Sequence, residues 1–405
     1  MYPMTINDKL TFENERLLQG RHKVHPYPAM LHPYLVGYLL DQYGKKSSTV
    51  LDPFCGTGVT LYESSKRNIT SIGFDINPLA LLIACVKTNQ YDFAILKDEF
   101  LKIEKLLHNE KNLSIPEIHN IDFWYKEEAI NELGKIRTVL KNNNFIYKDF
   151  FLTTFGFTAR NQSNTRNGEF KKYKMTKEKV ENHNPKVIEK FLAHTNASIQ
   201  LFMDSYAPKN IPKLFLTNSE NNFPNKISYD LVVTSPPYGD SKTTVAYGQY
   251  SSFATDWISD LNPFGEVEYK IDNESLGKKS DIELDINKFS ELNNVIKSIN
   301  NIDVKRANEV LLFFNGYYKS LKNTVKNLKS GGTLCFVVGN RTVKGYKIPM
   351  DQITSSFLNE LGLQFKEILV RDIVNKVMPA KNSPTNESGV KKSTMVNEYI
   401  VIFTK

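Results

Sequence analysis

Cysteine is scarce in this sequence, and long apolar runs are missing from it. The 405 residues include three cysteines, Cys55, Cys85 and Cys335, which lie far apart. They form neither a metal-ligand pair nor a disulfide framework, so we expect no metal site and a reducing, cytoplasmic environment. No apolar run approaches the roughly 18 residues that a membrane-spanning helix needs. The first 21 residues are polar and of mixed charge, unlike a signal peptide. A membrane partner is therefore not expected.

Acidic residues are outnumbered by basic ones. The chain has 52 Lys and Arg against 44 Asp and Glu, which gives a net charge of +8. A basic balance favours a polyanionic partner such as nucleic acid, although a generally lysine-rich proteome would produce the same excess. The length fits one α/β domain with insertions.

A glycine-rich turn follows the first short apolar run that reads as a buried strand. Residues 49–52 are predicted to be this strand, and a helix is predicted after the turn at residues 52–58. A strand, a tight turn and a helix bring the backbone close to a nucleotide-like ligand. Asp75 ends the next predicted strand, 17 residues after Gly58, where a carboxylate can accept hydrogen bonds from ribose hydroxyls. Helix capping is the alternative role for the two aspartates, Asp52 and Asp75.

The turn lacks the third glycine of the dinucleotide-binding fingerprint, and it begins with Asp52-Pro53. A carboxylate at this point would repel a pyrophosphate. It suits a cationic or amine-bearing ligand such as S-adenosyl-L-methionine instead.

A second motif, Thr234-Ser235-Pro236-Pro237-Tyr238, follows another apolar, β-branched run. Two consecutive prolines stiffen the loop and remove two backbone donors, which leaves its carbonyls available as acceptors. A hydroxyl, stiff acceptors and an aromatic ring together suit a planar group that carries an exocyclic NH2. A bare Pro-Pro-Tyr is more often only a turn that closes a strand.

Residues 90–210 interrupt the alternation of strands and helices, and they include a basic stretch with interleaved aromatic residues. Such a mixture suits contacts to phosphates and stacking on bases, and a solvated surface is the alternative. We predict nucleic-acid contacts from the following residues, the last of which lies in a polar loop after the second motif: Arg160, Arg166, Lys171, Lys172, Lys174 and Lys242.

The two motifs together resemble those of the amino-group DNA methyltransferases, in particular the cytosine-N4-specific enzymes of restriction–modification systems. The resemblance covers residues 22–90, 213–250 and 305–405. In most cytosine-N4 members the Ser-Pro-Pro-Tyr motif precedes the cofactor motif, whereas here it follows it. A C5-cytosine enzyme is excluded, because that class needs a catalytic cysteine preceded by proline, and no cysteine here follows a proline.

The resemblance implies a Rossmann-like class I methyltransferase, an α/β fold with a mostly parallel seven-stranded sheet and helices on both faces. Residues 1–90 and 211–405 would form the catalytic domain. Residues 91–210 would be an inserted helical and basic segment and a candidate DNA-recognition region, with 240–300 as a second one. A segment similar to the family's helix-start motif, His25 to Ala29, opens a stretch to Tyr43 that we predict to be helical from its leucine spacing.

The implied cofactor is S-adenosyl-L-methionine, and the implied partners are double-stranded DNA and a cognate restriction endonuclease in a prokaryotic cytoplasm. The implied cofactor-binding residues are His25, Pro26, Tyr27, Pro28, Ala29, Asp52, Pro53, Phe54, Cys55, Gly56, Thr57, Gly58, Asp75, Ile76, Asn218, Ser219 and Thr234. The implied catalytic residues are Ser235, Pro236, Pro237 and Tyr238, acting on the N4 amine of a flipped-out cytosine. Adenine-N6 methylation is the first alternative, and RNA methylation the second. A glutamine methyltransferase would carry Asn in place of Ser235, and a catalytically silent binding protein would not need every motif position filled.

Overall fold

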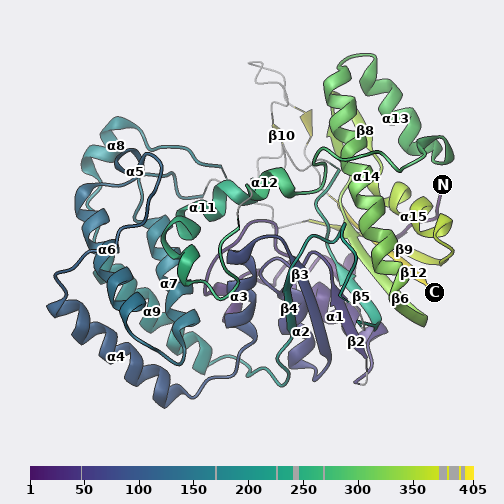
Figure 1. Cartoon of the computed structure of the whole chain (residues 1–405). Helices are drawn as coiled ribbons and strands as arrows, with labels where there is room; N and C mark the ends of the chain where they lie inside the picture. The colour runs from purple at the N-terminus through teal and green to yellow at the C-terminus, as the bar shows by residue number, and fades with distance from the viewer. Residues whose placement is uncertain are drawn as a thin grey trace.

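The computed structural model describes residues 1–46, 48–168, 171–224, 227–239, 246–267, 270–373, 381–382, 392–393 and 397–405. An eight-stranded sheet crosses the molecule in the order β1-β9-β12-β6-β5-β2-β3-β4 (Figure 1). Its strands are β1 (Thr5–Ile6), β2 (Thr49–Asp52), β3 (Thr70–Asp75), β4 (Lys213–Leu216), β5 (Tyr229–Thr234), β6 (Leu328–Val338), β9 (Gln364–Asp372) and β12 (Asn397–Thr404).

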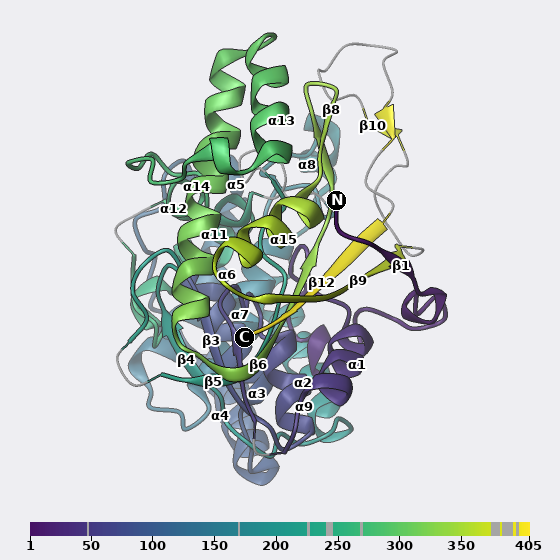
Figure 2. The same ribbon diagram turned by 90° about the vertical axis from the view of Figure 1, so that its right-hand side faces the viewer.

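Neighbouring strands are parallel except where β12 pairs with β6 and β9, to which it is antiparallel. Figure 2 shows β9 and β12 side by side. The mostly parallel, Rossmann-like α/β sheet is therefore confirmed, and the seven predicted strands are all present. The eighth strand is β1, a two-residue segment at the edge that the sequence pattern is too short to predict.

Alternating residues of each strand face two different layers of helices. In β2, Val50 packs in the cluster of α1 (Pro33–Tyr43) and the start of α2 (Val59–Lys66). Leu51 packs in the opposite cluster, with α14 (Val304–Lys326) and α15 (Met350–Glu360). Both faces of the sheet are covered, which explains why its central strands read as continuous apolar runs.

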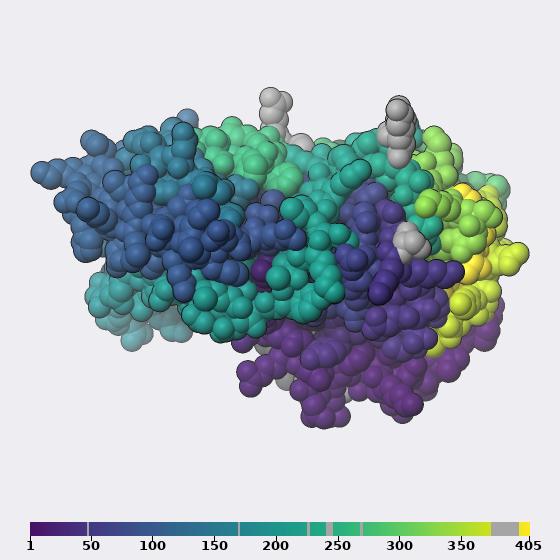
Figure 3. Space-filling view, turned by 90° about the horizontal axis from the view of Figure 1, so that it is seen from below, coloured from purple at the N-terminus to yellow at the C-terminus, as the bar shows by residue number. Residues whose placement is uncertain are grey.

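A helical lobe stands at one end of the sheet. It consists of α4 (Phe93–Asn109), α5 (Ile121–Trp124), α6 (Glu127–Asn142), α7 (Lys148–Asn161), α8 (Lys177–Asn182), α9 (Val187–Met203) and α11 (Tyr247–Ile258). The lobe shares one apolar cluster with α3 (Pro78–Thr88), which joins it to the sheet. In Figure 3 the lobe, in blue and teal, projects to one side of the body that carries the N-terminal and C-terminal segments.

The predicted second recognition segment, residues 240–300, is divided between two bodies. Phe253 and Trp257 of α11 are buried in the helical lobe, where Gly156 of α7 allows a close crossing because a Cβ there would lie 2.9 Å from the Cβ of Ala254. Residues from 276 onward, including α13 (Ser290–Asn300), pack beside α14. The short helix α12 (Ile271–Glu274) lies between these two parts.

Candidate functional site

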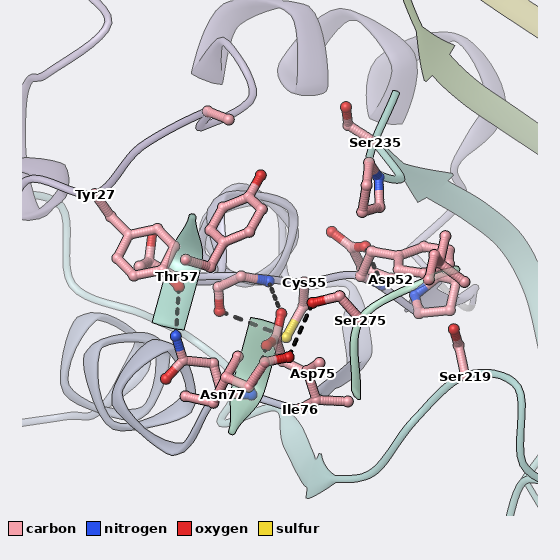
Figure 4. A pocket seen from close by; sticks show the side chains of 18 of the residues that line it. Tyr27, Asp52, Cys55, Thr57, Asp75, Ile76, Asn77, Ser219, Ser235 and Ser275 are labelled. Atoms are coloured by element: carbon pink, nitrogen blue, oxygen red, sulfur yellow. Dashed lines mark hydrogen bonds between the residues drawn. The ribbon is translucent and has the colours of Figure 1, made fainter. Parts of the chain in front are cut away.

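The site lies at the carboxyl ends of β2 and β5, which are neighbours in the sheet. The chain runs outward from β2 through β3 to β4, and it returns to β5 on the other side of β2. Such a reversal of strand order leaves a crevice beyond the strand ends, where α/β proteins bind ligands. A pocket is found there (Figure 4).

The turn between β2 and α2 needs its two glycines for different reasons. Gly56 and Gly58 have φ values of +48° and +72°, in the left-handed region that favours glycine. A Cβ on Gly58 would also lie 2.8 Å from the Cβ of Ala84 in α3, so the turn could not approach that helix with a larger residue. The backbone N–H of Gly56 donates to Oδ2 of Asp75 at 2.9 Å, which ties the turn to the end of β3.

Asp75 is held by backbone donors on both carboxylate oxygens, since Oδ1 accepts from the N–H of Asn77 at 2.8 Å. Burial raises the pKa of Asp75 to about 6, although these hydrogen bonds act to lower it. Its carboxylate lines the pocket with that of Asp52 (Figure 4). The described residues that line the pocket include the carboxylates of Asp52, Asp75 and Glu274 but neither Lys nor Arg, so the site suits a positively charged or hydroxyl-bearing ligand.

Asp52 joins the two motifs that the sequence singled out. Its Oδ1 accepts a 2.6 Å hydrogen bond from the hydroxyl of Thr234 at the end of β5 and a 3.1 Å bond from the N–H of Phe54. Burial raises the pKa of Asp52 to about 6, and the hydrogen bond from Thr234 acts in the opposite direction. Thr234 is completely buried, so its role here is to hold Asp52 rather than to face the pocket.

The loop after β5 places Ser235 and Pro237 in the pocket wall, whereas Pro236 is buried and outside that lining. The Ser235 hydroxyl lies 2.9 Å from the hydroxyl of Tyr238. Tyr238 in turn donates to Oε1 of Glu398 in β12 at 3.4 Å. Its ring is packed against the cluster of α14 and the sheet.

The segment predicted to open a helix does so later than expected. The prediction of helix from His25 is wrong, because α1 begins at Pro33. Pro26 and Pro28 disfavour helical backbone in the residues before them, and Ala29 has φ +54°. Tyr27, Pro28 and Ala29 line the pocket, but His25 does not. His25 is 1% exposed, its Nδ1 bonds the carbonyl of Pro26 at 3.0 Å, and burial lowers its pKa to about 3.

Asn218 and Ser219, the residues after β4, both line the pocket, but their polar groups are engaged elsewhere. The Asn218 amide donates to the carbonyl of Glu274 at 3.0 Å, and its oxygen accepts from the N–H of Glu220. The Ser219 hydroxyl lies 2.9 Å from that of Ser320 in α14. Asn218 therefore fastens α12 to the rim of the pocket.

Several lining residues were not predicted from the sequence. Asn77 and Tyr247 are the most informative, since Asn77 donates to the hydroxyl of Tyr27 at 2.7 Å and the ring of Tyr247 stacks on that of Tyr27 at 5.9 Å. The other unpredicted lining residues are Met30, Leu31, Val59, Thr217, Ile271, Glu274, Ser275 and Leu276. No sequence pattern signals α12, because its four residues are too few to show a period. Tyr247 gave a weak signal in the sequence, as an aromatic residue in a polar stretch after the Ser-Pro-Pro-Tyr motif.

The predicted basic residues do not all lie on one exposed surface. Arg160 is 4% exposed, with its guanidinium 3.9 Å from the centre of the Tyr250 ring. The prediction that Arg160 contacts phosphates is not consistent with this position, because a helix of the lobe core covers the guanidinium. Lys172 is half-buried, 4.6 Å from the Phe253 ring centre and 3.8 Å from Asp256.

The other predicted cations differ in exposure. Arg166 is exposed and Lys171 is partly exposed. Lys174 is also partly exposed, and its ammonium lies 3.8 Å from the centre of the Phe123 ring. Lys242 lies outside the described residues.

Two other classes of site find no support in the described ranges. There, no group of three or more His, Cys, Asp or Glu side chains could hold a metal ion. Across the same residues, the helices are too short or too polar to span a bilayer.

Comparison with known proteins identifies the family. The model of the DNA methylase family N6_N4_Mtase matches residues 6–85 and 229–405, which include both motifs. The chain is 37% identical to the Type II methyltransferase M.MvaI of Kocuria varians, over 98% of this chain and 93% of that protein. It is 22% identical to the Type II methyltransferase M.BsoBI of Geobacillus stearothermophilus, over 99% of this chain and 89% of that protein.

Among solved structures, the rRNA methyltransferase aviRa of Streptomyces viridochromogenes matches with a TM-score of 0.31 and 10% identity, over 93% of this chain and 86% of that chain. The family match falls on the strands that build the pocket and leaves out most of the helical lobe. The chain therefore belongs to the N6/N4 DNA methylase family, the amino-group methyltransferases that use S-adenosyl-L-methionine.

Proposed function

We propose that this protein is a site-specific, Type II DNA methyltransferase that methylates the exocyclic N4 amine of cytosine. The observation that carries the proposal is that Ser235 lines the pocket, on a proline-stiffened loop that follows β5, the strand next to β2 and its Asp52. The carbonyls of this loop and the hydroxyl of Ser235 can all accept hydrogen bonds, and an amine with two N–H groups needs two acceptors.

The residues of the pocket fit the cofactor of the family. Asp75 would accept hydrogen bonds from the ribose hydroxyls, and Asp52 with the Gly56 turn would lie against the methionine part, where the charge is positive. The raised pKa of both carboxyls expresses the cost of burying two negative charges without a cation. A cationic ligand would offset that cost. When bound, S-adenosyl-L-methionine supplies the activated methyl group.

The chemistry left to the protein is to prepare the amine. The lone pair of an exocyclic amine is delocalised into the ring, which makes the nitrogen a poor nucleophile. Acceptance of its two N–H groups by Ser235 Oγ and by the carbonyl of a loop proline would localise the lone pair on nitrogen. Most of the rate would come from this positioning, without a covalent intermediate.

The target base has to leave the duplex to reach such a pocket. Tyr238 is the proposed stacking partner for the extruded base. The helical lobe is the proposed recognition region, because the strands and their loops are committed to cofactor and base. Arg166, Lys171 and Lys174 are the cations of the lobe that we assign to DNA contacts.

Cytosine is preferred to adenine because Ser at the first motif position resembles the cytosine-N4 members, whereas Asp or Asn is usual in the adenine-N6 members. Both bases carry an NH2 next to a ring nitrogen, so adenine-N6 is the second candidate. The "Type II" in the names of the relatives supports site-specific action in a prokaryotic cytoplasm beside a cognate endonuclease.

Nucleoside mass spectrometry of DNA from cells that express the protein tests the proposal, with the Ser235→Ala variant as control. We expect N4-methylcytosine with the wild type and none with the variant. N6-methyladenine alone would contradict the base assignment. Methylated nucleosides in RNA but not in DNA would contradict the substrate.

A further inference from the structure

Ser235 is the end of a chain of polar side chains that runs away from the pocket. Its hydroxyl lies 2.9 Å from that of Tyr238, which lies 3.4 Å from Oε1 of Glu398. The other carboxylate oxygen of Glu398, Oε2, accepts from Nε and Nη2 of Arg371 at 2.9 and 2.6 Å. The chain therefore links the catalytic loop to the two antiparallel strands at the far side of the sheet.

The register of the sheet builds the Glu398–Arg371 pair. The two residues are directly opposite each other in β12 and β9, so their side chains project on the same face. The Arg371 and Glu398 side chains are only 6% and 15% exposed, and a third Arg371 nitrogen donates to the carbonyl of Leu10 at 3.1 Å. A buried, multiply bonded arginine fixes the carboxylate in place, with Oε1 left to face Tyr238.

The order of donors and acceptors along this chain follows from the number of protons. Arginine is always charged and only donates, and a carboxylate paired with it only accepts. Tyr238 keeps its proton, because burial and then the nearby Glu398 raise its pKa well above the usual value. That single proton is donated to Glu398, so the Tyr238 oxygen has to accept from Ser235. The single proton of Ser235 then points to Tyr238, which leaves the lone pairs of its oxygen available as acceptors.

We infer that Glu398 is a positioning residue that acts through Tyr238 to keep the Ser235 hydroxyl an acceptor toward the amine substrate. The inference rests on the proposed function, in which Ser235 accepts an N–H of the target amine. It assigns to a residue outside both motifs, 160 positions after Tyr238, a part in the methyl-transfer reaction.

Substitution of Glu398 by Gln gives a sharp test, because it changes the order of donors with almost no change of shape. The N–H groups of Arg371 would donate to the amide oxygen of Gln. This orientation of the amide places its NH2 group toward Tyr238. Tyr238 would then accept from the amide and donate to Ser235, whose own proton would point at the N–H groups of the amine. In Tyr238→Phe the ring remains but the series of hydrogen bonds is interrupted, so the Ser235 hydroxyl can adopt either orientation.

The measurement is kcat for methyl transfer to DNA, with cofactor affinity by calorimetry and thermal unfolding recorded for each variant. We expect kcat to fall about tenfold or more in Glu398→Gln, the scale of a lost hydrogen bond, with unchanged cofactor affinity. Tyr238→Phe should be milder. The double variant should match Tyr238→Phe and so be faster than Glu398→Gln alone, because no chain remains to be reversed.

Glu367→Gln is the matched control, since Glu367 on the same strand as Arg371 accepts from the hydroxyl of Tyr43 at 2.9 Å, remote from the pocket. It should leave kcat unchanged. Where Glu398→Gln lowers the unfolding temperature below that of the assay, Glu398→Asp is the second variant, and it should keep a higher kcat than Gln because it keeps the acceptor.

Wild-type kcat in Glu398→Gln, a double variant slower than Glu398→Gln, or an Asp variant slower than the Gln variant would overturn the inference. The proposed function fails separately, if the wild type transfers no methyl group to DNA. If the wild type methylates adenine, the base assignment fails while the same ranking of variants is still expected.

Discussion

The hydroxyl of Thr234 donates a 2.6 Å hydrogen bond to Oδ1 of Asp52, and both side chains are almost completely buried. This bond joins the last residue of β5 to the last residue of β2. The two sequence motifs are 182 residues apart, and they meet at this point in the sheet. The Ser-Pro-Pro-Tyr loop therefore takes its position from the strand that precedes the glycine turn.

Loss of that bond should destabilise the protein. In Thr234→Val the shape is kept, but Asp52 loses a donor in a buried site, which costs about 1–3 kcal/mol of unfolding free energy. Urea unfolding measures the change. Thr158→Val is the matched control, because the Thr158 hydroxyl donates only to the Thr154 carbonyl of its own helix, and its loss should cost less. Equal costs for the two substitutions would contradict a special role for the Thr234 bond.

Removal of the Asp75 carboxylate should weaken cofactor binding. We expect Asp75→Ala to lower the affinity for S-adenosyl-L-methionine by about 1.5–3 kcal/mol, the scale of hydrogen bonds to a charged group. Calorimetry on the folded variant measures this. Asp41→Ala, which removes an exposed carboxylate paired with Arg67, is the control and should leave affinity unchanged. Unchanged affinity in Asp75→Ala would remove that residue from the site.

A decrease in pH should weaken cofactor binding and should stabilise the folded protein without cofactor. The folded pKa values of Asp52 and Asp75 are about 6, above the ordinary 3.8, so the folded state takes up protons first. Their contribution to stability is therefore fully present below pH 3.8 and is lost as pH rises through 6. Cofactor affinity should change in the opposite sense, because the proposed mode of binding uses the ionised carboxylates.

Calorimetry and thermal unfolding between pH 5 and 8 measure the two effects on one sample series. Asp75→Ala should show a shallower pH dependence of affinity. The difference in unfolding temperature, Asp75→Ala minus wild type, should increase as pH rises. A wild-type affinity that is constant across pH 6 would contradict the assignment of these carboxyls to the site.

Ser235→Ala should reduce turnover with little change in cofactor affinity. In the proposed mechanism the hydroxyl acts on the amine as its charge develops in the transition state, so its loss should lower kcat and kcat/KM together. Single-turnover methylation of duplex DNA measures the rate of the chemical step. A variant that keeps the wild-type rate would show that Ser235 does not accept from the amine.

Neutralisation of Arg166, Lys171 and Lys174 to Gln should weaken DNA binding and reduce its dependence on salt. Each phosphate contact contributes about 0.9 to the slope of log K against log salt concentration. Lys97, Lys102 and Lys105 are three exposed cations of the same lobe on α4, which Figure 1 places at the other end of the lobe from α5 and α8. Their neutralisation removes the same charge and should change the slope less. Equal slopes for the two triple variants would indicate that the lobe contributes only its overall charge.

The sequence was sufficient for seven of the eight strands of the sheet and for both motifs, because their signals are local. A run such as residues 231–233 is buried on both faces and reads as a strand without knowledge of its neighbours. The glycine turn and the two prolines restrict backbone angles by themselves. The start of α1 was mispredicted because the helical leucine spacing extends to residues before Pro33. In that segment the prolines disfavour helical backbone.

Only the tertiary structure decided which distant residues share the site. Composition gave no reason to connect Tyr247 with Tyr27, or Glu398 with Tyr238, since these contacts depend on helix packing and on strand register rather than on neighbours in sequence. Charge was similarly ambiguous, because Arg160 and Lys174 have the same formal charge but one is covered by the lobe core and the other is not. Local backbone preferences thus determined the fold class and the motif-bearing loops. Burial and register, which are properties of the assembled chain, determined the walls of the pocket and the partners of Ser235.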